Sequence, residues 1–114
     1  MAFDFPAYHE ERARYHCSAG ELMDAIEQVL DELKWSGAQS GRWLFRASTG
    51  VSLWSWGENV VIEVNHGGRL FIRSECSFPT QCIDWGRNRS NVRRFLEQLD
   101  DILGEHEDET EEDD

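Results

Sequence analysis

The sequence predicts a two-layer α+β domain, in which two helices pack on one face of a four-stranded antiparallel meander. Three observations indicate this fold class. Residues 18–35 form a capped amphipathic segment, residues 41–76 alternate between apolar and polar side chains, and residues 90–104 form a second amphipathic segment. The length of 114 residues suits one domain with one modest core.

The first helix is predicted over residues 18–35 by its cap and its apolar stripe. Ser18 and Glu21 have the spacing of a capping box, and Gly37 follows as a stop signal. Apolar residues fall on one stripe, at Leu22, Ile26, Val29, Leu30 and Leu33, and the opposite face is acidic, with Asp24, Glu27, Asp31 and Glu32. The preceding residues 1–17 form an N-terminal extension, in which the alternation of residues 12–17 favours one short edge strand.

Four strands are predicted over residues 41–48, 51–57, 59–65 and 69–76, which are rich in aromatic and β-branched residues. The short breaks between them carry Gly and Asn, so we expect an antiparallel meander. The alternation assigns one set of side chains to the helix-covered face: Trp43, Phe45, Val51, Leu53, Val60, Ile62, Val64, Leu70 and Ile72.

The other face of the predicted sheet combines aromatic residues with arginines. Its members are Arg42, Leu44, Arg46, Trp54, Trp56, Val61, Glu63, Phe71 and Arg73. Such a face is not an ordinary solvated surface, and it favours a contact surface formed by Arg46, Trp54, Trp56, Phe71 and Arg73, most simply for a second copy of the chain. The alternative is that the strand register is misassigned and some of these aromatic side chains belong to the core.

The closing helix is predicted over residues 90–104. Its apolar stripe comprises Val92, Phe95, Leu96, Leu99, Ile102 and Leu103, and Gly104 is a C-cap. The single domain therefore spans residues 18–103. Residues 104–114 hold eight carboxylates and no Lys or Arg, and they predict an acidic disordered tail.

The charge is unevenly distributed along the chain. The formal net charge is −12, and without the tail residues 1–103 carry only −4. Residues 69–94 contain six arginines against two acids, a local net charge of +4. The overall acidity disfavours nucleic acid as a partner, because polyphosphate repels a negative chain.

The loop of residues 78–89 and the helix start after it form a second candidate site. Asp84 and Asn88 shape turns, Gly86 supplies a positive φ, and Asn88 or Ser90 caps the helix. Arg87, Arg89, Arg93 and Arg94 then surround a helix N-terminus, which favours anion binding, with the chain's own acidic tail as one occupant. The alternative is that these arginines pair with acids on neighbouring helix turns.

Catalytic and metal-binding patterns are not recognisable in the sequence, so we expect no enzyme activity and no cofactor. His9, His16 and Cys17 offer a weak alternative as metal ligands. The odd number of cysteines favours reduced thiols and a cytoplasmic protein, although a Cys76–Cys82 disulfide is an alternative. Residues 1–17 lack the pattern of a secretory signal. No segment has the run of about 20 apolar residues that a membrane-spanning helix needs, so we expect no contact with a membrane.

The stretches Ser55–Glu58 and Arg73–Asn91 carry a resemblance. They read S-W-G-E and R-S-E-C-S-F-P-T-Q-C-I-D-W-G-R-N-R-S-N, and they resemble small uncharacterised bacterial domains with a P-T-Q-x-x-D-W-G-[KR]-N loop. More distantly, the chain is similar to the "domain of unknown function" family number 1499. The resemblance implies a bacterial α+β domain and no activity, substrate or catalytic residue. The long acidic tail departs from that pattern.

Together these features predict a non-catalytic cytoplasmic module that binds a protein partner through the aromatic and arginine face and the 78–89 loop. The partner is a second copy of the chain or a basic protein. The alternative function is a small acidic inhibitor, of the immunity or antitoxin kind, that neutralises a basic protein.

Overall fold

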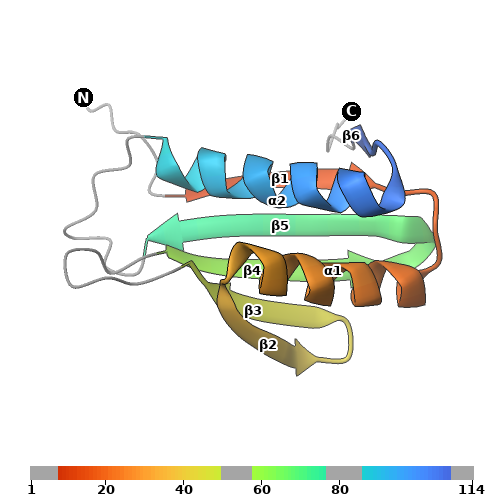
Figure 1. Ribbon diagram of the computed structural model, residues 1–114, viewed down its shortest axis with the longest axis horizontal. Helices are drawn as coiled ribbons and strands as arrows, with labels where there is room; N and C mark the ends of the chain where they lie inside the picture. Colours follow the sequence, from red (N-terminus) through yellow and green to blue (C-terminus); the bar gives the residue numbers. More distant parts are fainter. Residues whose placement is uncertain (1–7, 50–57, 77–85, 109–114) are drawn as a thin grey trace, which may run out of the picture.

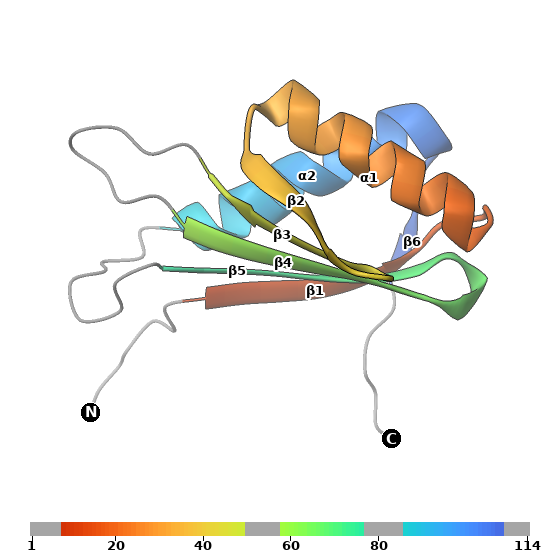
Figure 2. The same cartoon turned by 90° about the horizontal axis from the view of Figure 1, so that it is seen from below.

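The computed structural model describes residues 8–49, 58–76 and 86–108, and these form one α+β unit (Figure 1). Helices α1 (Ala19–Leu33) and α2 (Arg87–Leu103) lie side by side on one face of an antiparallel sheet, as predicted (Figure 2). The sheet has six strands rather than the four predicted, in the order β2-β3-β4-β5-β1-β6. Their bounds are β1 Tyr8–Arg14, β2 Ser36–Gly41, β3 Leu44–Ser48, β4 Glu58–Asn65, β5 Arg69–Cys76 and β6 Glu107–Asp108.

The start of α1 is confirmed and its end is corrected. Ser18 accepts a hydrogen bond from the Glu21 amide, and the Glu21 carboxylate accepts one from the Ser18 amide, which completes the capping box. The helix ends at Leu33, because Lys34 adopts a left-handed conformation with φ 62°. Gly37, predicted as the stop signal, lies in β2 instead.

Three of the predicted strands correspond to β3, β4 and β5, whereas the predicted strand over residues 51–57 lies outside the described residues. The N-terminal extension contributes β1, which pairs along its length with β5 and is therefore an integral strand of the sheet. Trp43 is corrected: it lies in the turn before β3 and is 43% exposed, not part of the core. Trp43 comes before the first residue of β3, and it lines a surface pocket with Ala19 and Val64 at the edge of the helix layer.

The core lies between the two helices and the sheet. Leu22, Ile26 and Val29 of α1 and Phe95 of α2 are fully buried there. The sheet contributes the side chains predicted for its covered face, Phe45, Val60, Ile62, Val64, Leu70 and Ile72, all of which are buried. Trp35 stacks on Phe95 with 6.2 Å between the ring centroids, which joins the end of α1 to α2.

The start of α2 differs from the prediction, and its end matches it. Gly86 is the N-cap, with the predicted positive φ of 90°, so neither Asn88 nor Ser90 caps the helix. Gly104 ends the helix with φ 96°, as expected for a C-cap. Residues 104–108, which the sequence assigns to the acidic tail, return to the sheet, where β6 pairs with Ala13 and Arg14 of β1.

Candidate functional site

Among the described residues, no helix lies on one face of the sheet (Figure 2), and we call it the open face. Strand register identifies its members, because side chains directly opposite on antiparallel strands share a face. One row across the sheet reads Arg12, Phe71, Glu63 and Leu44, and the next reads Glu10, Arg73, Val61 and Arg46. The register therefore groups Arg46, Phe71 and Arg73 of the predicted surface on this face, whereas Trp54 and Trp56 lie outside the described residues.

Arginine side chains of the open face lie over its aromatic rings. The Arg73 guanidinium is 4.0 Å from the centroid of the Tyr8 ring, and that of Arg12 is 4.8 Å from the centroid of Phe71. Arg73 also binds two carboxylates, Glu10 at 3.2 Å and Glu75 at 3.0 Å. These contacts hold the two arginines over the sheet, so the face presents cationic groups beside half-buried apolar side chains.

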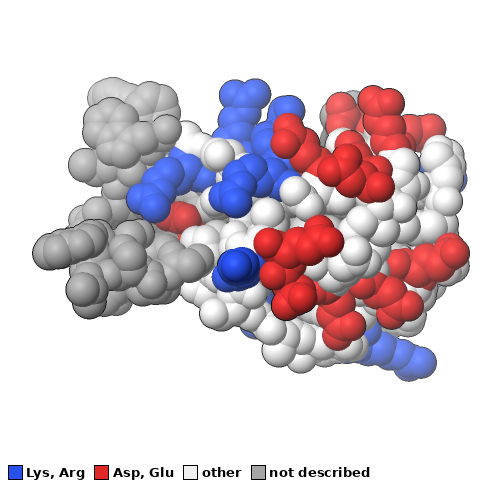
Figure 3. Space-filling view, viewed as in Figure 1, with Lys and Arg blue, Asp and Glu red and all other residues white. Residues whose placement is uncertain are grey.

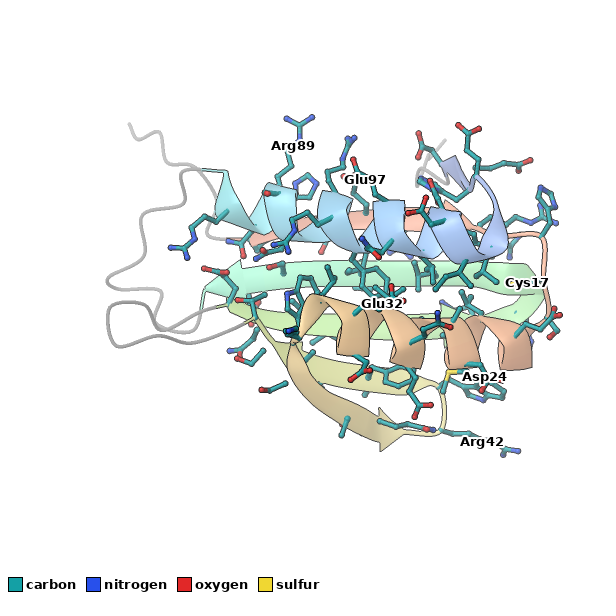
Figure 4. The ribbon with its side chains drawn as sticks, in the orientation of Figure 1. Cys17, Asp24, Glu32, Arg42, Arg89 and Glu97 are labelled. Atoms are coloured by element: carbon teal, nitrogen blue, oxygen red, sulfur yellow. The ribbon has the colours of Figure 1, made fainter. Side chains whose placement is uncertain are left out.

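The open face carries three half-buried apolar side chains among its charged ones. Leu44, Val61 and Phe71 are half-buried, and they lie on β3, β4 and β5, three adjacent strands. Arg42, which the sequence places on this face, lies instead in the turn between β2 and β3, where it contacts the Trp43 ring. Figure 4 shows Arg42 at the margin of the sheet.

The arginines at the start of α2 are only partly available for an anion. Nε of Arg93 is 2.8 Å from the Glu11 carboxylate of β1, and Nε of Arg87 is 3.4 Å from the Glu58 carboxylate of β4. Their partners thus lie on the sheet and not on neighbouring helix turns. Arg89 and Arg94 are exposed, and Figure 4 shows Arg89 pointing away from the sheet. Asp84 lies outside the described residues.

The Arg93 contact affects the acid that it meets. Burial alone would raise the pKa of Glu11, but hydrogen bonds from His9 and Arg93 outweigh it and hold the pKa below the usual value. His9 is 2.8 Å from Glu11 on the same strand. Among the described residues, no group of three or more His, Cys, Asp or Glu side chains is arranged to hold a metal ion.

A buried polar network that the sequence interpretation missed lies where β4 begins and β5 ends, under the first turns of α2. Ser74 donates to Asn88 at 2.7 Å, and Asn91 donates to Ser74 at 3.3 Å and to Glu58 at 2.9 Å. Thr49 donates to the same Glu58 oxygen at 2.9 Å. All five side chains are buried, and Ser74 and Asn88 are completely inaccessible.

This network contains residues of the stretches that carry the family resemblance. Asn88 and Asn91 lie on the same stripe of α2 as Val92 and Phe95, so two polar residues at core-facing spacing were the available signal. Every buried side-chain nitrogen or oxygen atom in the described residues has a hydrogen-bond partner. The network therefore joins α2 to the end of the sheet through side-chain hydrogen bonds.

A second polar cluster fixes the chain after α2. The Tyr15 hydroxyl donates to Asp100 at 2.7 Å, and His106 Nδ1 is 2.7 Å from the same carboxylate oxygen. Burial, with the hydrogen bond to Asp100, raises the pKa of Tyr15 far above its ordinary value of 10. Burial also raises the pKa of the Cys17 thiol, which is free. Cys76 and Cys82 cannot be compared, because the Cys76 side chain and Cys82 lie outside the described part.

Charge is segregated on the helix-covered side of the molecule. Figure 3 shows arginines over the first half of α2 and carboxylates along α1. The α1 carboxylates, all exposed, are Glu21, Asp24, Glu27, Asp31 and Glu32. No helix in the described residues is long and apolar enough to cross a membrane.

Comparison with models of known protein families gives no match, and no curated protein matches the chain. The resemblance to the "domain of unknown function" family number 1499 therefore stays a prediction.

Proposed function

We propose that the protein is a non-catalytic cytoplasmic interaction module that associates with a second copy of itself through the open face. The observation that carries this proposal is the difference between the two faces of the sheet. Helices cover one face, whereas the open face combines half-buried Leu44, Val61 and Phe71 with arginines stacked on aromatic rings. Aromatic residues and arginine are enriched in protein–protein interfaces relative to the rest of the protein surface.

Self-association is supported by the mixture of charges on the open face. A two-fold interface places the same patch on both partners, so it must be self-complementary. The open face carries the basic side chain of Arg46 and the acidic one of Glu63, so Arg46 of one copy can meet Glu63 of the other, whereas Arg73 already pairs with Glu10 and Glu75 of its own chain. A purely basic or purely acidic face would repel its own copy.

We also propose that the protein is not an enzyme. The hydrogen bonds that the buried polar side chains make with one another support this part of the proposal. The Glu58 carboxylate accepts hydrogen bonds from Thr49 and Asn91, and Arg87 lies 3.4 Å from it. A general acid or base needs a carboxyl group that can reach substrate. Glu58 has only 7% of its side chain exposed, which suits a structural role.

The test is the molar mass in solution, measured by light scattering after gel filtration at several protein concentrations. We expect a dimer of the full chain, and we expect Phe71→Asp to give a monomer because it replaces an apolar ring of the interface with a charged side chain. Trp43→Asp is the matched control, since Trp43 is an exposed aromatic residue of the β2–β3 turn. A wild-type monomer at every concentration, or equal dissociation by the control, would contradict the proposal.

A second candidate function, the small acidic inhibitor of a basic protein, is favoured by the exposed carboxylates of α1 (Figure 3). Such a surface steers a basic partner toward the helix-covered side and speeds association at low salt. A basic protein encoded next to this chain, bound with salt-dependent affinity, would support this function. Binding that does not change with ionic strength would contradict it.

A further inference from the structure

A groove of about 290 Å³ lies between the second half of α1 and the edge strand β2. Glu27 and Asp31 of α1 form one rim, and Gly37 and Gln39 of β2 form the other. Leu30, Trp35 and Phe45 line its interior. The rim residues are exposed, so the groove opens to solvent, whereas the three apolar residues are buried beneath them.

The strand beside the groove is an edge strand of the described sheet. β2 is the first strand in the sheet order, and within the described ranges it pairs only with β3. All six of its residues are exposed. The outer backbone amides and carbonyls of such a strand are a template on which a further strand can pair.

Gly37 keeps the groove open. It lies opposite Ala47, a buried residue, so its missing side chain would point to the helix-covered side where the groove lies. A Cβ atom at Gly37 would also come within 2.6 Å of the Ala47 Cβ, which real side chains do not tolerate. Glycine is thus required for β2 to approach β3, and it leaves space between β2 and α1.

Within the described part of the chain, no cation pairs with the carboxylates on the rim. Glu27 and Asp31 are four residues apart on α1, which brings like charges together on one side of the helix. Neither takes part in an ion pair within the described part of the chain. This repulsion is relieved when a positive group lies between them, so the rim is complementary to lysine or arginine.

We infer that this groove binds an extended basic segment of a partner protein, which pairs with β2 as an additional strand. Alternate side chains of a strand face the same side. The segment therefore presents lysine or arginine to Glu27 and Asp31 and, two residues on, an apolar side chain above Leu30 and Trp35. Backbone pairing supplies affinity, and the alternate side chains supply specificity. The inference rests on the second function proposed above and is independent of self-association through the open face.

The first experiment measures fluorescence anisotropy of a labelled peptide, Lys-Thr-Val-Thr-Lys-Thr-Val, titrated with the full chain. We expect saturable binding that weakens with salt. The double variant Glu27→Gln/Asp31→Asn should weaken it at least tenfold. Asp24→Asn/Glu32→Gln is the matched control, because it removes the same charge from exposed positions of α1 outside the groove lining (Figure 4). An equal loss in the control would overturn the inference and leave only non-specific attraction.

The second experiment separates strand pairing from side-chain attraction. The same peptide with N-methyl groups on alternate residues keeps its charge but loses backbone donors, and we expect it to bind at least tenfold more weakly. Equal binding of the two peptides would contradict strand addition.

Location is tested by amide chemical shifts of the ¹⁵N-labelled chain with the unmodified peptide. We expect the largest changes at residues 36–41 and in the second half of α1. Changes confined to the open face would overturn the inference. Gel filtration of the groove variant Glu27→Gln/Asp31→Asn separates the two proposals. If the variant loses peptide binding but keeps the molar mass of the wild type, the groove binds the peptide independently of self-association. If the variant loses the dimer, a second copy occupies the β2 edge, and the inference is wrong.

Discussion

The Ser74 hydroxyl donates a hydrogen bond of 2.7 Å to the side-chain oxygen of Asn88, and this bond joins the end of β5 to the first turn of α2. Both residues are completely buried, so no water can replace either partner. Asn91, one turn further along α2, donates to the same Ser74 oxygen and to Glu58 of β4. The start of α2 is therefore held by side-chain hydrogen bonds in place of the side-chain cap that Gly86 cannot provide.

Replacement of either asparagine should destabilise the fold. Asn88→Ala leaves the buried Ser74 hydroxyl without its acceptor, and Asn91→Ala removes a donor from Glu58. Each should lower the free energy of unfolding by about 1–3 kcal/mol, measured by urea denaturation. Asn59→Ala is the control, because Asn59 is an exposed residue of β4 and its loss should cost less than about 0.5 kcal/mol. Equal effects at Asn88 and Asn59 would show that the network adds no stability.

Gly67 and Gly68 separate two reasons for glycine. Both have a positive φ, 73° and 76°, which any other residue adopts at a cost of about 1 kcal/mol. A Cβ at Gly67 would meet no atom within 4 Å, whereas one at Gly68 would lie 2.0 Å from the Tyr15 carbonyl oxygen. The Tyr15 amide donates a hydrogen bond of 2.8 Å to the Gly68 carbonyl, which holds the two segments together at this point.

We therefore expect Gly67→Ala to lower the free energy of unfolding by about 1 kcal/mol and Gly68→Ala to lower it by about 3 kcal/mol or more. Thermal denaturation of the two variants, followed by circular dichroism, measures the difference. Because the φ penalty is common to both positions, the excess at Gly68 reports the close approach of the turn before β5 to Tyr15, the residue after β1. Similar melting temperatures would refute the close approach.

The fold class follows from the sequence because its strongest patterns are apolar. The stripe of α1 and the alternation of β3, β4 and β5 each bury one face, and this fixes two layers. β2 was missed because Ser-Gly-Ala-Gln-Ser-Gly has no apolar alternation and every residue is exposed. β1 was only partly recognised because the residues that it turns toward α2, His9 and Glu11, are polar and meet partners there instead of apolar side chains.

The candidate sites were predicted less completely, for a related physical reason. The alternation of apolar and polar residues assigns a side chain to one face of the sheet but does not identify the residues that it contacts. It therefore places Arg46, Phe71 and Arg73 on one face, as the strand register does. The contacts of Arg93 with Glu11 and of Arg87 with Glu58 join residues far apart in the chain, and no local pattern encodes them. Asn88 was assigned to a cap because Asn commonly caps helices, but here tertiary contacts bury it.

Glu11 should make stability depend on pH. Its pKa in the folded chain lies below the ordinary value of 4.5, so its contribution is complete above that value and is lost as the pH falls through the folded pKa. Glu11→Gln should therefore be less stable than the wild type near pH 6, and the two should converge as the pH falls below the folded pKa of Glu11. Urea denaturation at a series of pH values measures the gap. A Glu11 gap that persists undiminished in acid would argue against an ionic cause.

The acidic tail and the arginines of α2 remain a proposed pair, and β6 sets the geometry for testing it. Asp108 lies opposite Ala13, and Glu11, which holds Arg93, is two residues further along β1, or about 7 Å. The six residues 109–114 span at most about 20 Å, so their carboxylates can reach Arg93 and the exposed Arg89 and Arg94. A chain ending at residue 108 keeps β6 and the His106 contacts, unlike one cut at 104.

We expect this shortened chain to bind a fluorescent Glu-Asp peptide several-fold more tightly than the full chain at low salt. The shortened chain lacks the competing carboxylates, and its net charge is less negative. Arg89→Gln/Arg94→Gln in the shortened chain should abolish the gain if these arginines are the site. Arg42→Gln/Arg46→Gln, which removes equal charge elsewhere, should keep it. A gain that survives loss of Arg89 and Arg94 would reduce the tail effect to net charge, and no gain on shortening would exclude tail occupancy altogether.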